Sequence, residues 1–344
     1  MKTLLAQLVD GTPLSVEQAV YGFSQIMSGA AEPTQTAALL ALIAQRGPTV
    51  DELVGAAQVM REMAVPVAVP DGLTVIDTCG AGGTGSTFFN ISTAAALVAA
   101  GAGRPLGVAV AKHGNRSVTS RSGSSNVLEQ LGVNLQPAPD VLTRCLDEAG
   151  MCFCFAPAHH PAMKHAGSVR AALGFRTIFN LVGPLTNPAG ARRQLIGVPS
   201  PDVCELIAEA LLRLDAEWCL LVNSILPDGR SLGELTTFGP TQATELNHGL
   251  IKSYPIDPAT LGLPFAVPDA VTIETPADSA RLVMRVLDND AGPARDIVLL
   301  NAAAALLVAA AAESLEHGLE LAATAVADGA AKRVLDQLVA LTNA

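Results

Sequence analysis

The sequence predicts an α/β protein with a small N-terminal helical domain and a larger α/β domain whose sheet is mainly parallel. Three patterns carry this prediction: helix-type apolar spacing in the first 65 residues, alternating strand and helix patterns from residue 73, and a helical tail from Ser279. Strands that alternate with helices are typical of a parallel sheet covered by helices. A Pro- and Gly-marked linker at residues 66–72 predicts domains at 1–70 and 71–344, and the 344-residue length accommodates both.

The first 65 residues carry helix start and stop signals. Two pairs have the spacing of capping boxes: Ser15 with Gln18, and Thr49 with Glu52. Pro33 suits the first turn of a helix that runs toward Gln45, and Gly47 ends it. These signals predict a bundle of short helices.

After the linker, short apolar runs alternate with helical patterns. The expected strands cover residues 73–77, 108–111, 152–155, 194–198 and 219–222. The expected helices cover residues 90–100, 123–131, 141–149, 161–173 and 201–214. The apolar stretch at 297–312 contains Asn301 and is shorter than the roughly 20 residues of a membrane span, so a buried Ala-rich helix is expected there.

Composition excludes several classes of protein. Half of the residues are hydrophobic, which excludes a disordered chain, and the formal net charge of −11 argues against a general nucleic-acid binder. Acidic residues are missing from two windows, residues 78–128 and 149–201, while cations remain in both. The retained cations are Arg104, Lys112, Arg116, Arg121, Lys164, Arg170, Arg176, Arg192 and Arg193. A buried Ala- and Gly-rich core would exclude both signs of charge, so we predict an anion site built from the two windows.

The six cysteines lack the spacing of zinc ligands, and the N-terminus lacks the pattern of a signal peptide. Reduced thiols in a cytoplasmic protein are therefore expected. Cys152 and Cys154 alternate with apolar residues, as in a buried strand.

A Gly-rich loop at residues 80–86 follows the first expected strand and precedes a helix. Such a loop lets the backbone approach a phosphate closely, at a helix N-terminus with free N–H groups. It matches neither a Walker loop nor a dinucleotide fingerprint. Asn90, Ser92 and Thr93 then place an amide and two hydroxyls at the helix start, where they are helix caps or ligands of phosphate or hydrated Mg²⁺.

A basic segment, Lys112-His-Gly-Asn-Arg116, lies just beyond the expected strand 108–111. Ligands of α/β folds bind at the carboxyl ends of parallel strands. Hydroxyls and N–H donors follow at residues 117–125. The segment is thus a candidate ligand loop, and a solvated loop is the alternative.

Long motifs at these positions resemble the anthranilate phosphoribosyltransferase family. They are the loop 80–93, the segments 112–116 and 122–124, His159-His-Pro-Ala-Met-Lys164 with Val169-Arg170, and the segments 176–188 and 296–302. The resemblance runs over nearly the whole chain in order and spacing. It implies a fold of the nucleoside phosphorylase/phosphoribosyltransferase type, with the helical domain joined by helices around 165–190, and a homodimer paired through the small domains.

The resemblance also implies a reaction. The amino group of anthranilate attacks C1 of 5-phosphoribosyl 1-diphosphate and pyrophosphate leaves, in the branch toward tryptophan. By the same resemblance the donor contacts are Gly80, Gly83, Thr84, Asn90, Ser92, Thr93, Lys112, Ser120 and Ser124. Gly80, His113, Asn115 and Arg170 line the anthranilate pocket, and Ser92 and Glu234 hold Mg²⁺. No side chain is expected to act as a general acid or base, because neutralised pyrophosphate leaves readily. Arg170 can pair with a carboxylate through its two-pronged guanidinium.

The chain departs from the family pattern at four positions near the donor and the metal. Ala81 and Phe88 replace hydroxyl residues, and Thr84 and Gly233 replace acids. We expect weaker Mg²⁺ binding and a donor pocket crowded by Phe88. Two alternatives stay open: an impaired paralogue that binds a phosphorylated ligand or nucleic acid, and a pyrimidine nucleoside phosphorylase, for which a nucleobase motif is missing.

Overall fold

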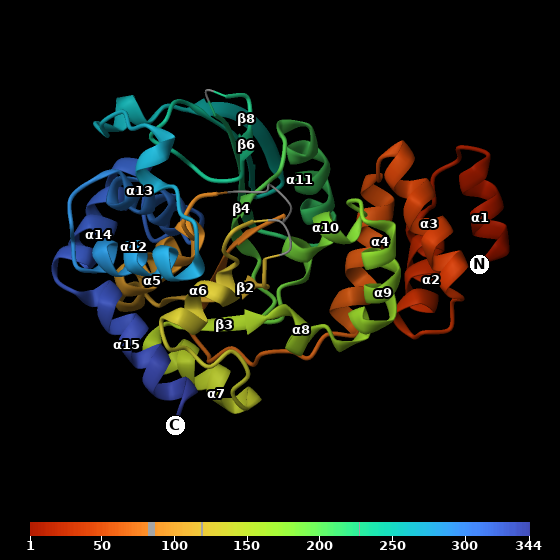
Figure 1. Cartoon of the computed structure of the whole chain (residues 1–344), viewed down its shortest axis with the longest axis horizontal. Coiled ribbons are helices and arrows are strands. Elements are labelled where there is room, and N and C mark those ends of the chain that lie inside the picture. Colours follow the sequence, from red (N-terminus) through yellow and green to blue (C-terminus); the bar gives the residue numbers. More distant parts are fainter. Residues whose placement is uncertain (82–86, 118–119, 227) are drawn as a thin grey trace.

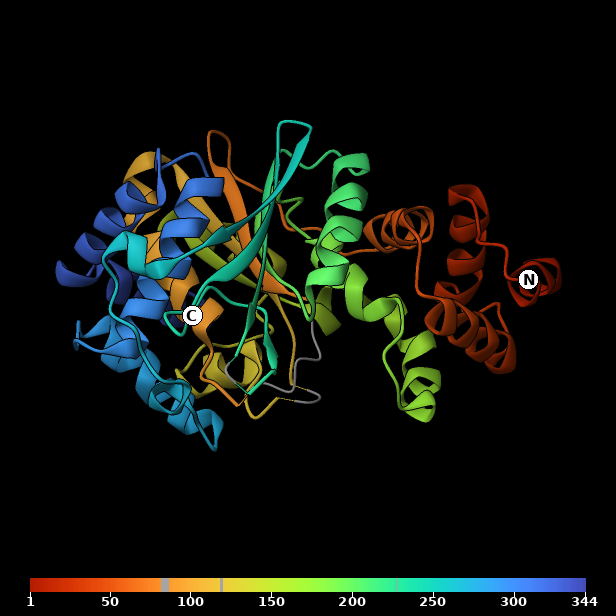
Figure 2. The same ribbon diagram turned by 90° about the horizontal axis from the view of Figure 1, so that it is seen from above.

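The computed structural model describes residues 1–81, 87–117, 120–226 and 228–344. A small helical domain lies beside a larger α/β domain, as Figures 1 and 2 show from two directions. The fold class predicted from the sequence is confirmed. Residues 82–86, 118–119 and 227 lie outside the description.

The helical domain is built from two separate pieces of chain. The first piece forms α1 (Lys2–Val9), α2 (Val16–Met27), α3 (Pro33–Arg46) and α4 (Val50–Glu62). The second piece, α9 (Lys164–Leu173), packs against α2 and α3. Both capping boxes form as predicted, at the starts of α2 and α4, and Pro33 opens α3.

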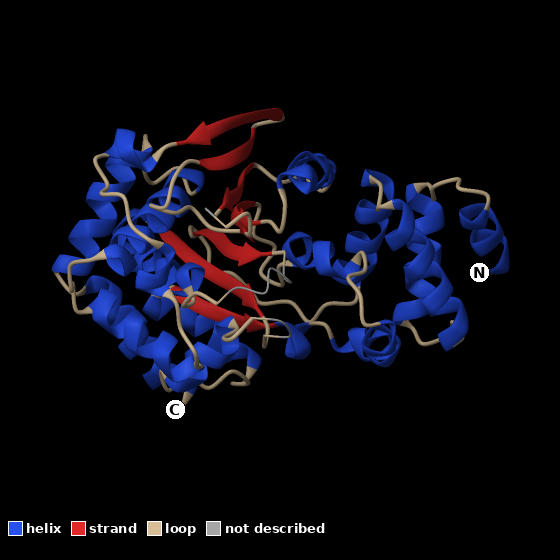
Figure 3. Ribbon diagram, turned by 45° about the horizontal axis from the view of Figure 1, so that its top comes forward, coloured by secondary structure: helices blue, strands red, loops and turns tan. Residues whose placement is uncertain are grey.

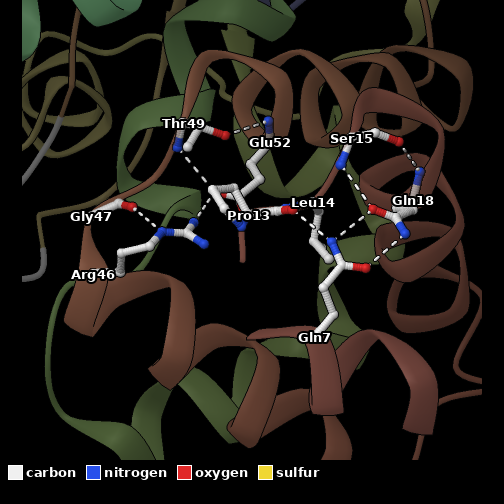
Figure 4. Close-up of polar contacts among 9 residues, drawn as sticks. All are labelled: Gln7, Pro13, Leu14, Ser15, Gln18, Arg46, Gly47, Thr49 and Glu52. Carbon is white, nitrogen blue, oxygen red and sulfur yellow. Dashed lines mark hydrogen bonds and ion pairs between the residues drawn. The ribbon is translucent and has the colours of Figure 1, made fainter. Parts of the chain in front are cut away.

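A buried carboxylate ties the loops of this domain together (Figure 4). Glu52 is fully buried and accepts hydrogen bonds from the backbone N–H of Leu14 (3.1 Å) and of Thr49 (2.9 Å). It also forms an ion pair with Arg46, whose Nε donates to the carbonyl of Gly47 (3.2 Å). A buried charge is tolerated when it is paired and hydrogen-bonded, so Glu52 joins the loop before α2 to the loop before α4.

One sheet forms the centre of the α/β domain, with strand order β3-β2-β1-β4-β5-β7-β8 and β6 paired to β5. The parallel strands are β1 (Thr74–Gly80), β2 (Val108–Gly114), β3 (Met151–Phe155), β4 (Arg193–Gly197) and β5 (Trp218–Ile225). The antiparallel strands are β6 (Ser231–Leu232), β7 (Thr241–Asn247) and β8 (Leu250–Ile256). Sequence patterns had indicated the five parallel strands and had missed the antiparallel ones.

The parallel strands run toward the helical domain, so their carboxyl ends face it (Figure 3). In register, Gly80 of β1 lies opposite Gly197 of β4. The prediction that β2 ends at residue 111 is wrong: the strand continues to Gly114 because Lys112 and His113 pair with β3. Lys112 and His113 therefore belong to a strand that is hydrogen-bonded to β3, and not to a loop.

Helices cover both faces of the sheet. One face packs against α5 (Ile91–Gly103) and α13 (Pro293–Val308), which form the Ala-rich centre of the larger core. The other face packs against α11 (Cys204–Arg213), which contacts α4, so the core of the helical domain continues onto this face. The remaining α-helices are α6 (Ser124–Gln130), α7 (Pro139–Arg144), α8 (Ala156–His159), α10 (Phe179–Val182), α12 (Pro276–Leu287), α14 (Leu315–Ala327) and α15 (Ala330–Thr342).

All six cysteines are free thiols, as predicted, and all are buried, which the sequence had indicated only for Cys152 and Cys154. Among the described residues, none of the helices combines the length and the hydrophobicity that a membrane crossing requires.

Candidate active site

Several of the predicted site residues lie where β1 and β2 end and α5 begins. Gly80 ends β1, Lys112 and His113 lie near the end of β2, and Ser92 lies in the first turn of α5. Gly83 and Thr84 fall outside the described residues. The carboxyl edge of the sheet and the start of α5 thus form the base of the candidate site, called the floor below.

Lys112 is the buried cation of this floor, with 1% of its surface exposed. Its Nζ donates to the carbonyl of Thr78 and lies 3.4 Å from the hydroxyl oxygen of Ser92. Burial lowers the pKa of Lys112, while the charges of Asp77, Cys79 and Glu234 oppose that shift. A buried ammonium held beside a helix start presents positive charge to an anion.

Glu234 comes from the connection between β6 and β7 and meets Ser92 and Lys112. Burial raises the pKa of Glu234 to about 7, against the opposing effects of the Lys112 charge and of hydrogen bonds from the backbone and hydroxyl of Ser92. The structure therefore brings together three residues that lie far apart in sequence and that the resemblance assigned to the donor and the metal.

The donor set at this point fits Mg²⁺. A carboxylate and a hydroxyl are oxygen ligands, and Mg²⁺ in proteins commonly takes one or two carboxylates and keeps waters and phosphate oxygens. In the part of the chain that the structure describes, no group of three or more His, Cys, Asp or Glu residues is placed to hold a metal. Ser92 and Glu234 would thus supply a minority of an octahedral shell.

Asn90 is already engaged by protein groups. Its amide nitrogen donates to the carbonyl of Ser122 (3.1 Å), and its amide oxygen accepts from the hydroxyls of Ser122 (2.6 Å) and Ser279 (2.7 Å). Asn90 therefore joins the start of α5 to the loop before α6 and to α12. Thr93 differs, because its buried hydroxyl has no hydrogen-bond partner among the described residues.

Three further predicted residues follow β2: Asn115 and Ser120 in the loop, and Ser124 as the first residue of α6. Asn115 is exposed, and its carbonyl accepts from the hydroxyl of Ser124 (3.3 Å) at the start of α6. Ser120 accepts a hydrogen bond from the hydroxyl of Ser117 through its carbonyl, so its own hydroxyl is not used in that contact. The roles of these residues in donor and anthranilate binding stay predictions.

Burial favours the neutral form of His113. Burial, together with the charges of His160 and His159, lowers the pKa of His113 to about 3. Its ring centre lies 5.1 Å from that of His160, and its Nε2 has no hydrogen-bond partner among the described residues. His159 instead contacts the carbonyl of Val65 through Nδ1 (2.8 Å). The buried Nε2 of His113 is available to a ligand. The contact of His159 with Val65, by contrast, fixes the chain just before the linker between the domains.

Arg170 lies on α9, on the helical side of the molecule, with its guanidinium 5.5 Å from the ring centre of Phe179. Burial lowers the pKa of Arg170. No ion pair involves it in the described ranges. A guanidinium without an acidic partner can take a carboxylate from a ligand.

The anion site built from the two acid-free windows stays a prediction, but some of their nine cations already have acidic partners. Four of them pair with acids from outside the windows: Arg116 with Glu129, Arg121 with Glu274, and Arg192 and Arg193 with Glu217. These cations are neutralised by long-range contacts that the sequence does not display. Of the other five cations, Lys112 from the first window and Arg170 from the second are the predicted ligand contacts, so both windows still contribute a candidate.

Phe88 packs into the core of the larger domain. It is 4% exposed, packs with its ring 5.9 Å from that of Phe238, and belongs to the larger core. Its backbone pairs with Thr272. The side chain is part of the core, and the expected crowding of the donor pocket stays a prediction.

Sequence reasoning missed Asp77 and Asn187. Asp77 is fully buried; its Oδ1 accepts from the backbone N–H of His113 (3.0 Å) and its Oδ2 from the side-chain amide of Asn187 (2.8 Å). Burial raises the pKa of Asp77, and the nearby Lys112 charge opposes the rise. Asp77 precedes the Gly-rich loop, which was the only signal in the sequence.

Two family profiles match the chain. Residues 72–332 match the profile described as glycosyl transferase family, a/b domain, and residues 2–64 match glycosyl transferase family, helical bundle domain. These matches cover most of the two domains seen in the fold.

Several known proteins are similar over the full length. The anthranilate phosphoribosyltransferase of Caulobacter vibrioides is 48% identical over 342 residues, covering 99% of this chain and 97% of that protein. The Moorella thermoacetica protein of the same name is 46% identical over 340 residues, covering 99% and 98%.

Solved structures agree with this relationship. The crystal structure of the Thermus thermophilus anthranilate phosphoribosyltransferase superposes with a TM-score of 0.89 at 38% identity and covers 99% of both chains. The Saccharomyces cerevisiae enzyme in complex with PRPP and Mg has a TM-score of 0.87 at 23% identity, covering 98% of this chain and 96% of that one, and shares the fold.

Proposed function

Because the chain belongs to the anthranilate phosphoribosyltransferase family, we propose that it transfers the phosphoribosyl group of 5-phosphoribosyl 1-diphosphate to the amino group of anthranilate and releases pyrophosphate. It is an enzyme of the pentosyl-transfer class, and its product belongs to tryptophan biosynthesis. The single observation that carries the proposal is the meeting of Lys112, Ser92 and Glu234 at the carboxyl edge of a parallel sheet.

The chemistry needs positioning more than proton transfer. The amine nitrogen forms a bond to C1 of the ribose while the bond from C1 to the diphosphate oxygen breaks. Holding both reactants in this geometry and neutralising the leaving group supply most of the acceleration. We propose that Lys112, buried at the end of β2, faces the departing anion and that Arg170, on α9, holds the carboxylate of anthranilate.

We propose Mg²⁺ as the cofactor, held by Ser92 and Glu234. When bound, the ion neutralises charge on the diphosphate and orients it. The raised pKa of Glu234, about 7, means that binding of a cation competes with protonation of this carboxylate. His113, whose Nε2 has no hydrogen-bond partner in the part of the chain that the structure describes, is proposed to line the anthranilate pocket beside Gly80 and Asn115.

We further propose a homodimer paired through the helical domains and a cytoplasmic location. Val9 (70% exposed) and Tyr21 (50% exposed) are apolar side chains on the outer surface of α1 and α2, where a second copy would cover them. Light scattering of the purified protein tests the dimer. The six free thiols favour a reducing compartment.

Consumption of anthranilate tests the function directly. Purified protein is mixed with anthranilate and 5-phosphoribosyl 1-diphosphate across a Mg²⁺ series, and the loss of anthranilate fluorescence is followed. Turnover that requires the diphosphate donor supports the proposal. A folded protein without turnover at any Mg²⁺ concentration contradicts it and favours the impaired paralogue.

A further inference from the structure

The backbone around Glu234 is held by side chains rather than by a strand ladder. Glu234 follows the two-residue strand β6 and precedes β7, in a stretch without regular secondary structure. The hydroxyl of Ser224, on β5, donates to the carbonyl of Glu234 (2.8 Å) and also contacts the hydroxyl of Thr241 (2.7 Å). One side of the segment is thus fastened to the sheet.

A second fastening comes from inside the Ala-rich core. Asn301 lies on α13 and is fully buried. Its Oδ1 accepts from the backbone N–H of Leu235 (3.1 Å), and its Nδ2 donates to the carbonyl of the same residue (2.8 Å). The Nδ2 also donates to the carbonyl of Ile297 (2.8 Å) within the helix. Both backbone groups of the residue after Glu234 are therefore held by one amide.

An amide in such a core is costly unless its polar atoms are satisfied. Within α13 alone, Asn301 would satisfy only one donor; the other two bonds go to a segment 66 positions away in sequence. A buried amide whose hydrogen bonds are all formed favours one conformation of the backbone segment to which it is bonded. The hydrogen bonds to Leu235, and not the packing of α13, therefore explain why an asparagine lies at position 301 in this apolar core.

The third fastening is a close approach of two backbones. A Cβ placed on Gly233 would lie 2.8 Å from the carbonyl carbon of Gly197 and 2.8 Å from the nitrogen of Val198. Real Cβ atoms do not approach this closely, so the segment rests directly on the carboxyl end of β4. Gly197 in turn accepts from the backbone N–H of Ala81 (2.8 Å). The Glu234 segment is thereby linked to the start of the Gly-rich loop.

We propose that Asn301, assisted by Ser224, is a positioning residue for Glu234: it acts through the backbone of residues 234 and 235 to hold the carboxylate beside Ser92 and Lys112. The inference rests on the proposed function, because it concerns the carboxylate assigned to Mg²⁺ and diphosphate. Groups that orient a ligand in this way commonly change metal affinity by about 10- to 100-fold when removed.

The test compares Asn301→Ala and Ser224→Ala with the matched control Ser253→Ala. The hydroxyl of Ser253, on β8, also forms a hydrogen bond with a hydroxyl of a neighbouring strand, that of Thr244 on β7 (2.9 Å). This contact does not involve the Glu234 segment. Isothermal titration with Mg²⁺ and inorganic pyrophosphate measures the affinity of each folded variant. A second titration measures anthranilate, which Arg170 on the helical side is proposed to bind.

We expect Asn301→Ala and Ser224→Ala to lose about tenfold or more in affinity for Mg²⁺–pyrophosphate, with anthranilate binding within about twofold of the wild type. Ser253→Ala is expected to match the wild type in both titrations. If Asn301→Ala does not fold, Ser224→Ala decides, since it removes a single hydroxyl.

Two outcomes overturn the inference, and they differ in what else they overturn. Wild-type affinity in the folded variants, accompanied only by a lower melting temperature, shows that Asn301 and Ser224 serve stability alone, and the proposed function survives. Failure of the wild-type protein to bind Mg²⁺–pyrophosphate removes the proposed function and the positioning role together.

Discussion

Arg170 is a cation without an acidic partner in the described part of the chain, next to the ring of Phe179. At the scale of single residues, such a side chain is explained either by packing or by a ligand. A guanidinium that pairs with a carboxylate contributes about 1.5–3 kcal/mol. The two explanations make different predictions for kinetics.

We expect Arg170→Ala to raise the KM for anthranilate by about 10- to 100-fold and to leave the KM for the diphosphate donor nearly unchanged. Initial rates with each substrate varied in turn measure both constants. Arg213→Ala is the matched control, because Arg213 forms an exposed ion pair with Asp51 on the surface. Equal changes in both constants, or no change in the KM for anthranilate, would contradict the assignment.

A second prediction at this scale concerns His113, whose pKa is lowered to about 3 by burial. The unfolded chain binds a proton near pH 6.5 and the folded chain does not, so the contribution to stability is complete above pH 6.5 and falls as the pH drops toward 3. At pH 5 the loss from this residue is about 2 kcal/mol.

His113→Asn is therefore expected to flatten the decline of unfolding free energy between pH 7 and pH 5. Denaturant titrations at several pH values measure the slope, and His248→Asn, in an exposed turn, is the control. A slope identical to that of the wild type would show that His113 takes up a proton in the folded protein.

At the scale of helices and strands, the sequence predicted correctly those features that depend only on interactions between residues close together in the chain. The capping boxes at Ser15 and Thr49 satisfy their N–H groups locally and formed as predicted. The end of β2 was misplaced, because pairing with β3 extends it through Lys112 and His113. The strand β7 (Thr241–Asn247) was missed because its Thr-rich pattern does not resemble a buried strand.

The site shows the same division between local and long-range information. Motif resemblance indicated Ser92, Lys112 and Glu234 separately, and the fold brought them together. The two hydrogen bonds between the Asn301 side chain and the Leu235 backbone join residues 66 positions apart. The Ala-rich helix that contains Asn301 gives no local sequence signal of this contact. The ion pairs that neutralise Arg116 and Arg121 likewise depend on tertiary contacts.

Glycines within helices give a prediction at this scale. Gly101 of α5 lies against the backbone of α15, where an added Cβ would meet the nitrogen of Ala331 at 2.7 Å. Gly167 of α9 has open space around it. Gly101→Ala is therefore expected to destabilise the protein by about 1–3 kcal/mol, and Gly167→Ala to stabilise it by up to about 1 kcal/mol.

Denaturant unfolding of the two variants measures this difference. Each replaces a helical glycine by the same residue, so helix propensity is matched and only the contact differs. Equal changes in the unfolding free energy would show that α5 and α15 separate without cost.

At the scale of the whole molecule, the core of the helical domain continues through α4 and α11 onto one face of the sheet. Shared apolar surface couples the unfolding of the parts that bury it. Arg61 adds to the coupling by donating to the carbonyls of Leu185 (2.6 Å) and Leu214 (3.2 Å). We expect the helical domain to unfold together with the sheet.

Leu40→Ala tests this coupling. Leu40 is fully buried in α3, and its truncation is expected to cost about 2–5 kcal/mol. Trp218, the single tryptophan of the chain, lies on β5 in the other domain and reports on the sheet by fluorescence. Fluorescence and far-UV circular dichroism should shift to the same lower midpoint. A shift in circular dichroism alone would mean that the helical domain unfolds independently.

The path of the chain also determines where the protein can be divided. The helical domain takes α9 from a piece of chain that enters after β3, and Ala166 and Val169 of this helix lie in the core shared with α2 and α3. A gene fragment that encodes only residues 1–70 would leave that apolar face uncovered. Exchange of whole domains between homologous enzymes would therefore need three crossover points: one near residue 70 and one on each side of α9.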